Sequence, residues 1–372
     1  MPLSWLLEAA SPTIIYRAYA EIVPEGDRDP ERLAALRQAV LDYKIAQAIA
    51  RKQKAATGLW GGNLLGPVAS KAYGWTETGT VYQYRRLLEL GWPPSERPFR
   101  LADRFLFQIL SRIEPDDPDR MIAQRAQELL VEFQKPAKTD VGLARWARRM
   151  GREAAACALA RGVHGDDPRV RGTAHNIASS ISQYLRSELV AKPFKKVQGK
   201  TVLDPAAYPP TIFAIEMLAF LPPVQRERAG FIERLGHYFS SPAPRRVLYI
   251  LAGKKLFKPL FELLGDPLRA DAAGHVTDVP FAFYWLELMA RLGLVRQMPS
   301  ASRVLARLYS ECDDAGIWSP KSLRAAPKAT SPLTAHYFPL EGPGKSPAQR
   351  QTDATFRLGL IAKLMGIPLE IG

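Results

Sequence analysis

The sequence predicts an all-α protein, and three observations support that prediction. No stretch of the 372 residues shows sustained alternation of apolar and polar residues. Helical periodicity dominates instead. Proline-rich breaks such as "GWPPSERP" at 91–98 and "DPAAYPP" at 204–210 separate helical runs. We therefore expect about a dozen or more helices and almost no strand.

The composition is that of a globular chain, with 47% apolar and 24% charged residues. The two most apolar stretches are 211–224 and 279–294, and each contains a glutamate, Glu216 and Glu287. A charge within so short an apolar run indicates a buried core helix and not a membrane span.

The cysteines and the first residues bear on the compartment. Cys157 and Cys312 are the two cysteines, too far apart in sequence to suggest a disulfide framework or a structural zinc site. The start "MPLSWLLEAASP" lacks a basic segment and is a poor signal peptide. We expect a cytoplasmic protein with no cofactor and no metal.

Two helices stand out in the first half of the chain. Residues 29–56 are rich in Ala, Leu, Arg and Lys and carry Pro30 near their start, where proline is tolerated. Residues 143–160 predict an amphipathic helix. Its apolar face is expected to hold Leu143, Trp146, Ala147, Met150, Ala154 and Cys157. Its opposite face is expected to hold Arg145, Arg148, Arg149 and Arg152.

The net charge is +14, and most of it lies in the middle of the chain. Residues 145–269 contain 21 Lys and Arg against 10 Asp and Glu, which gives +11. Such asymmetry favours an anionic partner, although a plain basic surface is the simpler interpretation. The candidate anion-binding residues are Arg145, Arg148, Arg149, Arg152, Lys195 and Lys196, with Lys192 and Lys200 beside them.

One short unit recurs along the chain. A threonine is followed eleven residues later by Gly or Pro at Thr13–Pro24, Thr80–Gly91, Thr211–Pro222 and Thr355–Gly366. A threonine near a helix start can cap free N–H groups, and glycine ends a helix readily. The unit therefore predicts helices of about three turns. Residues 281–293 follow the same apolar pattern without the threonine.

Two of these units follow a Gly-x-Trp turn, at Gly58-Leu59-Trp60 and at Gly316-Ile317-Trp318. Glycine permits the positive φ that a helix exit needs, and the indole can fold back over neighbouring helices. The tryptophans either line a cavity or act as staples between helix pairs. We favour staples.

Gln53-x4-Gly58-x-Trp60, followed by the Thr80 helix, resembles the Gln–Trp repeat of the squalene-cyclase and prenyltransferase superfamily. Gly316-x-Trp318 with "TDATFRLGLIAKLMGIP" resembles its closing repeat, with Asp313-Asp314 on the glutamine side of the motif. The resemblance implies an α/α-toroid, with helical hairpins in a closed ring around a central cavity, over residues 1–372 as one domain. The alternative is an open, HEAT-like superhelix, in which the first and last helices lie apart.

The catalytic motifs of that superfamily are missing. The chain has no Asp-x-Asp-Asp, and Ser310-Glu311 stand where the Asp of a zinc-binding Asp-x-Cys pair would precede Cys312. The resemblance therefore implies an architecture and leaves the catalytic residues unknown.

The segment 319–352 has little periodicity and is expected to be a long irregular loop of the kind that often carries function. Within it, "TAHYFPLE" is the part expected to be ordered, anchored by Tyr337, Phe338 and Leu340. The candidate residues for the lining of a cavity are Trp60, Tyr73, Trp75, Glu77, Trp318, His336, Tyr337 and Asp353.

Three functions stay open. The first is a toroid that binds a small-molecule or isoprenoid-like ligand in its cavity. The second is a basic helical-repeat protein that binds nucleic acid. The third is an enzyme that acts on an isoprenoid or polysaccharide substrate, which would need a pocket carboxylate of strongly raised pKa.

Overall fold

The computed structural model describes residues 2–61, 63–67, 78–111, 141–244, 248–252, 255–320, 332–341 and 346–369. It is 60% helix and 7% strand, which confirms the prediction of a mostly helical protein. Among the described helices, none combines the length and the apolar character that crossing a membrane requires.

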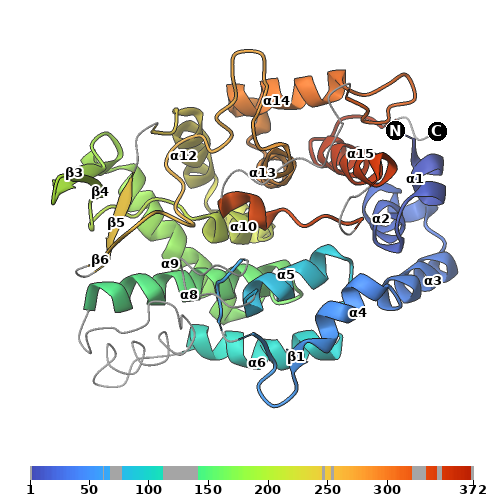
Figure 1. Ribbon diagram of the computed structural model, residues 1–372, viewed down its shortest axis with the longest axis horizontal. Coiled ribbons are helices and arrows are strands. Elements are labelled where there is room, and N and C mark those ends of the chain that lie inside the picture. The colour runs from blue at the N-terminus through green and yellow to red at the C-terminus, as the bar shows by residue number, and fades with distance from the viewer. Residues whose placement is uncertain are drawn as a thin grey trace. The chain divides into compact units, whose positions relative to one another are not determined.

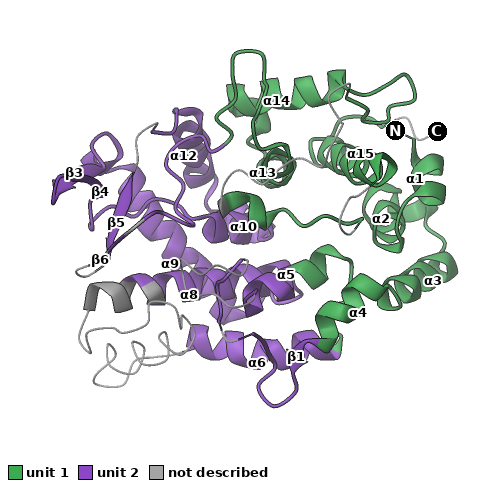
Figure 2. Ribbon diagram, viewed as in Figure 1, with its two compact units in different colours: residues 1–51, 86–96, 268–372 green, residues 52–85, 97–267 purple. Residues whose placement is uncertain are grey.

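The chain divides into two compact units, coloured separately in Figure 2. Unit 1 comprises residues 1–51, 86–96 and 268–372, and unit 2 comprises residues 52–85 and 97–267. The prediction of a single toroid-like domain stays a prediction.

Unit 1 is built from helices, of which η1 is a π-helix and η2, η5 and η6 are 3-10 helices. In chain order they are α1 (Leu3–Ala9), α2 (Pro12–Arg17), η1 (Ala18–Ile22), η2 (Glu25–Asp27), α3 (Pro30–Leu41), α4 (Lys44–Arg51), the end of α5 (Thr80–Glu89), α13 (Val279–Arg291), η5 (Val295–Gln297), α14 (Pro299–Ser310), η6 (Pro332–His336) and α15 (Pro347–Leu364).

Unit 2 combines helices with two small sheets. Its elements are β1 (Gln53–Lys54), β2 (Leu59–Trp60), the start of α5, α6 (Arg97–Ser111), α8 (Val141–Arg161), α9 (Pro168–Leu185), η4 (Glu188–Val190), β3 (Phe194–Val197), β4 (Lys200–Leu203), α10 (Ile212–Ala219), α11 (Pro222–Glu227), α12 (Ala229–Ser240), β5 (Tyr249–Ala252) and β6 (Lys255–Phe257).

Unit 2 contains a four-stranded sheet, ordered β3-β4-β5-β6, whereas the sequence predicts almost no strand. Its first hairpin turns at Gln198-Gly199, both at positive φ (51° and 74°). A two-residue turn of this kind is a type I′ turn, whose twist matches the flanking strands. Because the strands are short, no period-2 signal emerges from the sequence, and Gln-Gly is a weaker hairpin signal than the Asn-Gly or Asp-Gly of typical two-residue turns.

The structure confirms the recurring helical unit at the starts of two helices and at the ends of two helices. Thr80 opens α5, and Thr211 caps α10 by accepting the N–H of Ala214. Gly91 and Gly366 both take positive φ and close their helices. In each case the next residue donates its N–H to a carbonyl five positions back, as in a Schellman motif.

Three predicted boundaries are wrong. Residues 29–56 do not form one helix: α3 ends at Leu41, α4 runs from Lys44 to Arg51, and Gln53–Lys54 form β1. Thr355 lies in the middle of α15, because Ser346 and Gln349 form a capping box that starts the helix at Pro347. The predicted loop 319–352 therefore ends several residues earlier. Within it, Phe338 and Leu340 are buried, as expected of anchors.

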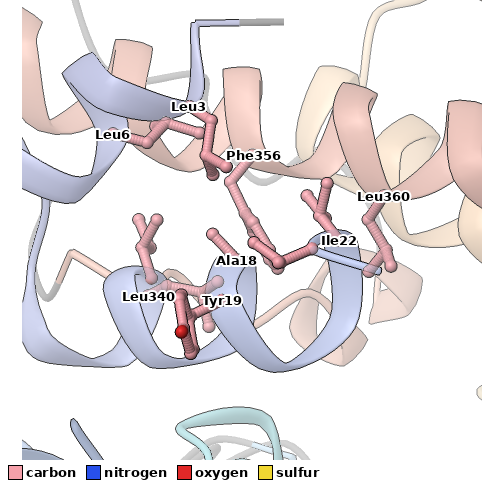
Figure 3. Packing of buried hydrophobic residues seen from close by; sticks show 10 residues of the cluster. Leu3, Leu6, Ala18, Tyr19, Ile22, Leu340, Phe356 and Leu360 are labelled. Carbon is pink, nitrogen blue, oxygen red and sulfur yellow. The ribbon is translucent and has the colours of Figure 1, made fainter. Parts of the chain in front are cut away.

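The first and last helices of the chain pack together within unit 1. Figure 1 shows α15 beside α1 and α2, and Figure 3 shows the apolar side chains between them. Leu3 and Leu6 of α1 lie in one cluster with Phe356 and Leu360 of α15. Ser11 adds a hydrogen bond, donating its N–H to Glu341 Oε1 at 2.7 Å.

The amphipathic helix expected at 143–160 is α8, and Met150, Ala154 and Cys157 are fully buried as predicted. Arg149 does not lie on a solvent face. Its side chain is 15% exposed and is held by Glu153 at 2.8 Å. The side chains of residues 141–145, Arg145 among them, lie outside the described part of α8.

Candidate functional site

The first Gly-x-Trp turn lies in unit 2 and connects β1 to β2. Gln53 pairs with Trp60 in this small sheet, and its side-chain amide donates to the carbonyls of Gly58 (2.8 Å) and Pro98 (2.7 Å). Gly58 takes φ +71°, and a Cβ there would lie 2.6 Å from the backbone oxygen of Leu101. Glycine is therefore required twice, for its φ and for the close approach.

The second Gly-x-Trp turn lies in unit 1 and shares the glycine conformation of the first, but it is one residue shorter. Gly316 takes φ +78°, and Cys312 forms an isolated bridge with Trp318. Glu311 lies five positions before Gly316, just as Gln53 lies five positions before Gly58. Glu311 accepts the indole N–H of Trp318 at 3.1 Å. Asp313 accepts N–H groups within the turn, from Ala315 and Ile317.

In both turns, the backbone of the tryptophan is hydrogen-bonded to a threonine of the following helix, Thr80 for the first turn and Thr355 for the second. The N–H of Trp60 donates to Thr80 Oγ1 at 3.1 Å, and the N–H of Trp318 donates to Thr355 Oγ1 at 3.0 Å. Thr80 also donates its hydroxyl to the carbonyl of Trp60 at 2.9 Å. Trp60 and Trp318 are 1% and 4% exposed, so both tryptophans are buried, each within its own unit.

A ring of alternating arginines and carboxylates lies inside unit 1. Its members come from α2, η1, the end of α5, α13 and α15. In order around the ring they are Arg17, Glu89, Arg357, Glu287, Arg291 and Glu21.

Arg17 joins the two helical segments at the start of the chain to the end of α5. It contacts Glu21 at 2.5 Å and Glu89 at 2.9 Å, and it also donates to the backbone carbonyl of Glu89. Burial alone would lower the pKa of Arg17, but the carboxylates around it outweigh burial and raise that pKa. The guanidinium is therefore a fixed positive charge in the core.

Arg357 of α15 is the most enclosed member, with a side chain 1% exposed. It reaches Glu89 at 3.1 Å, Glu287 at 3.7 Å and Asp353 at 2.9 Å, and it donates to the carbonyl of Phe338. Burial opposes its charge, and the surrounding anions again raise its pKa.

Arg291 closes the ring, with Glu287 at 2.8 Å and Glu21 at 3.8 Å. This side is the more open one, because the Glu21 side chain is 31% exposed. The ring thus runs from a fully enclosed side at Arg357 to a partly accessible side at Glu21. Such a network costs much desolvation, so its ion pairs are weak evidence for a stabilising role.

Tyr337 and Asp353, two residues proposed from the sequence, join this ring. The Tyr337 hydroxyl donates to Asp353 at 2.6 Å, and the guanidinium of Arg357 lies 4.5 Å from the centre of the Tyr337 ring. Burial, and then the charge of Asp353, raises the pKa of Tyr337 well above its usual value. The phenol is therefore a hydrogen-bond donor at neutral pH.

The other proposed lining residues are distributed as follows. His336 is buried and lies 5.9 Å from the ring of Tyr284, within unit 1 like Tyr337 and Asp353. Trp318 packs edge-on against Phe283 at 5.6 Å. Trp60 belongs to unit 2. Tyr73, Trp75 and Glu77 lie outside the described residues.

Unit 2 has a smaller buried charge cluster. Arg85 and Arg161 both contact Glu216, and the Arg161 distance is 2.7 Å. Arg85 and Glu216 are fully buried. Burial, followed by the charge of Glu216, raises the pKa of the Cys157 thiol well above its usual value. This thiol is therefore protonated and poorly reactive at neutral pH.

A second group in unit 2 surrounds Glu153, which accepts from Arg149, Tyr208 and Thr211. The guanidinium of Arg149 lies 3.5 Å from the centre of the Tyr208 ring. Arg149 is committed to this internal group, which argues against its place in a basic surface.

The remaining anion-binding candidates are more accessible. Arg148 and Arg152 of α8 are partly buried, whereas Lys195 and Lys196 are exposed on β3. In the described residues, no three or more His, Cys, Asp or Glu side chains are grouped as metal ligands.

Sequence reasoning missed five of the six ring members and used the sixth, Glu287, only as evidence against a membrane span. The available signal was a charged residue inside an apolar helical run, such as Arg357 in "ATFRLGLIA".

Comparison of the chain with protein-family models, with curated proteins and with solved structures finds no match.

Proposed function

We propose that this chain is an α/α-toroid protein, resembling the squalene-cyclase and prenyltransferase repeats, that binds an uncharged isoprenoid-like alcohol. Its binding residues are Tyr337 and Asp353, on the arginine–carboxylate ring of unit 1. The observation that carries the proposal is the Tyr337 hydroxyl, which joins a ring of six buried or half-buried charges through Asp353.

The charge of the site determines the ligand class. Counting Asp353 with the ring, three arginines face four carboxylates, so the described residues supply no excess positive charge. A diphosphate would meet at least as much negative as positive charge, which is unfavourable where water is excluded. A ligand hydroxyl group, in contrast, can donate to the Tyr337 phenol oxygen or to Asp353.

The apolar part of the ligand would lie along α13, which is rich in buried aromatic rings. Phe281 and Trp285 stack with ring centres 6.0 Å apart, and Tyr284 lies 6.3 Å from Phe281. An aromatic wall with a few convergent polar groups is the usual composition of a small-molecule site.

Two observations support the toroid. The two Gly-x-Trp turns share their glycine φ, their buried indole and their threonine partner, as two copies of one repeat would. The first and last helices pack together in unit 1. Small-angle X-ray scattering tests this architecture, because a compact chain of 372 residues should have a radius of gyration of about 21 Å. A much larger value would favour an open superhelix.

Isothermal titration tests the ligand class. Geranylgeraniol is expected to bind saturably, and geranylgeranyl diphosphate at least about tenfold more weakly, since the site has no cation to spare for phosphate. Tighter binding of the diphosphate would refute the charge argument. No saturable binding of either compound would refute the proposed ligand class.

A further inference from the structure

The β3–β4 hairpin of unit 2 is a short two-stranded ribbon with a polar tip. Phe194 pairs with Leu203 at its base, and Val197 pairs with Lys200 next to the Gln198-Gly199 turn. Val202 and Leu203 are buried, which anchors the base of the ribbon in unit 2. The half nearer the turn is exposed.

Positive charge is concentrated on this ribbon. Residues 192–200 contain four lysines and no acidic residue, and all four lysines are exposed: Lys192, Lys195, Lys196 and Lys200. Among the described residues, a carboxylate lies within 4 Å of one of them, Asp204 at 3.8 Å from Lys195. The ribbon therefore keeps most of its charge available to a partner.

Edge protection explains only part of this pattern. β3 is the edge strand of the sheet, and lysines on an edge prevent pairing with other chains. That role fits Lys195 and Lys196. Lys200 lies on β4, which is paired on both sides, and Lys192 precedes β3. Two of the four lysines thus need another explanation.

The lysines lie on both faces of the ribbon. Neighbouring residues of a strand point to opposite faces, so Lys195 and Lys196 project in opposite directions. Lys200 lies opposite Val197 and therefore shares the face of Lys195, where its ammonium is 4.9 Å from the Tyr249 ring centre. A ribbon charged on both faces is complementary to a groove with two negative walls.

We propose that the β3–β4 hairpin is an arm that binds duplex DNA by placing its exposed half between the phosphate walls of the major groove. The major groove of B-form DNA, about 12 Å wide, admits a two-stranded ribbon, whereas that of duplex RNA is too narrow. An anionic membrane fits less well, because a flat surface meets one face and the Gln198-Gly199 tip offers no apolar side chain for insertion. This inference is independent of the ligand proposed for unit 1.

The charge predicts the salt dependence of binding. Four lysine–phosphate contacts should give a slope of about −3.6 in a plot of log affinity against log salt. The contacts carry no base readout, so affinity should vary little with DNA sequence.

Fluorescence anisotropy with a labelled duplex of about 20 base pairs, titrated with the full chain at about 50–200 mM NaCl, tests the proposal. The hairpin variant replaces Lys192, Lys195, Lys196 and Lys200 with alanine. The control variant removes the same charge from exposed residues elsewhere, by replacing Arg37, Lys44, Lys52 and Lys54 with alanine.

The hairpin variant should lose most of the salt slope and at least about tenfold in affinity, while the control changes by about threefold or less. Equal losses in both variants would reduce the effect to net charge and overturn the proposal. So would an absence of DNA binding at low salt. Equal or tighter binding of the matching RNA duplex, or retention on phosphatidylserine vesicles without DNA binding, would also overturn it.

Discussion

The two units solve one structural problem in different ways. Each buries charged side chains on otherwise apolar helices, yet in unit 1 the charges form a closed ring, while in unit 2 two arginines share Glu216. Each also holds one Gly-x-Trp turn with a threonine partner, but the surroundings of the two glycines differ. We therefore expect the same sequence motif to contribute differently to stability in the two units.

The largest expected difference in unfolding free energy is between variants of the two buried charge clusters. Arg357→Met leaves Glu89, Glu287 and Asp353 without their shared cation and should cost about 3–5 kcal/mol of unfolding free energy. Arg85→Met leaves Glu216 paired with Arg161 and should cost about 1–3 kcal/mol. Urea unfolding of both variants, monitored by circular dichroism, checks the order. A larger loss for Arg85→Met would contradict the ring as the more interdependent network.

The next largest difference in stability is expected between variants of the two turn glycines, Gly58 and Gly316. Gly58→Ala combines a positive φ with a Cβ 2.6 Å from the backbone of Leu101, so it should cost about 3–4 kcal/mol. Gly316→Ala has the same strained φ, but its nearest neighbour is Pro2 Cδ at 3.4 Å, and about 1–2 kcal/mol is expected. Thermal unfolding of the pair is the measurement. Equal losses would mean that backbone strain alone sets the cost.

The threonine partners should show a smaller difference in the same direction. Thr80→Val removes a hydrogen bond to the N–H and another to the carbonyl of Trp60, at an expected cost of about 2 kcal/mol. Thr355→Val removes the bond to the N–H of Trp318, at about 1 kcal/mol. Chemical denaturation resolves this difference. If neither variant loses stability, the threonine–tryptophan link is incidental to the turn.

The smallest effect concerns pH. Burial raises the pKa of Glu341, outweighing hydrogen bonds from Ser11 and Thr352 that lower it. A carboxyl group with a raised folded-state pKa binds its proton more tightly when folded, so its contribution to stability falls as pH rises above about 4.5. Glu341→Gln cannot titrate, and its stability relative to the wild type should rise between about pH 4 and pH 7. A flat or falling difference in urea unfolding would contradict this.

The local part of this structure was predictable from the sequence, and the long-range part was not. The glycine φ at 58 and 316, the cap at Thr211 and the buried helices α10 and α13 follow from local chemistry. The ring was not predictable, because Arg17, Glu89 and Arg357 are brought together by packing between segments far apart in the chain.

The candidate site shows the same division. Tyr337 and Asp353 were proposed as lining residues, and the structure joins them by a hydrogen bond, but no sequence pattern pairs either one with Arg357. The strands were missed for another reason. They are three or four residues long in the β3–β6 sheet, too short for alternation to emerge.

The most direct test of the account is geranylgeraniol binding by Tyr337→Phe, with Tyr309→Phe as the control. Tyr309 donates a long hydrogen bond to the carbonyl of Leu358 and is not part of the ring. We predict that Tyr337→Phe stays within about 2 kcal/mol of wild-type stability yet binds the alcohol about tenfold more weakly, while Tyr309→Phe binds normally. Unchanged affinity in Tyr337→Phe would show that the arginine–carboxylate ring does not serve the binding of this ligand.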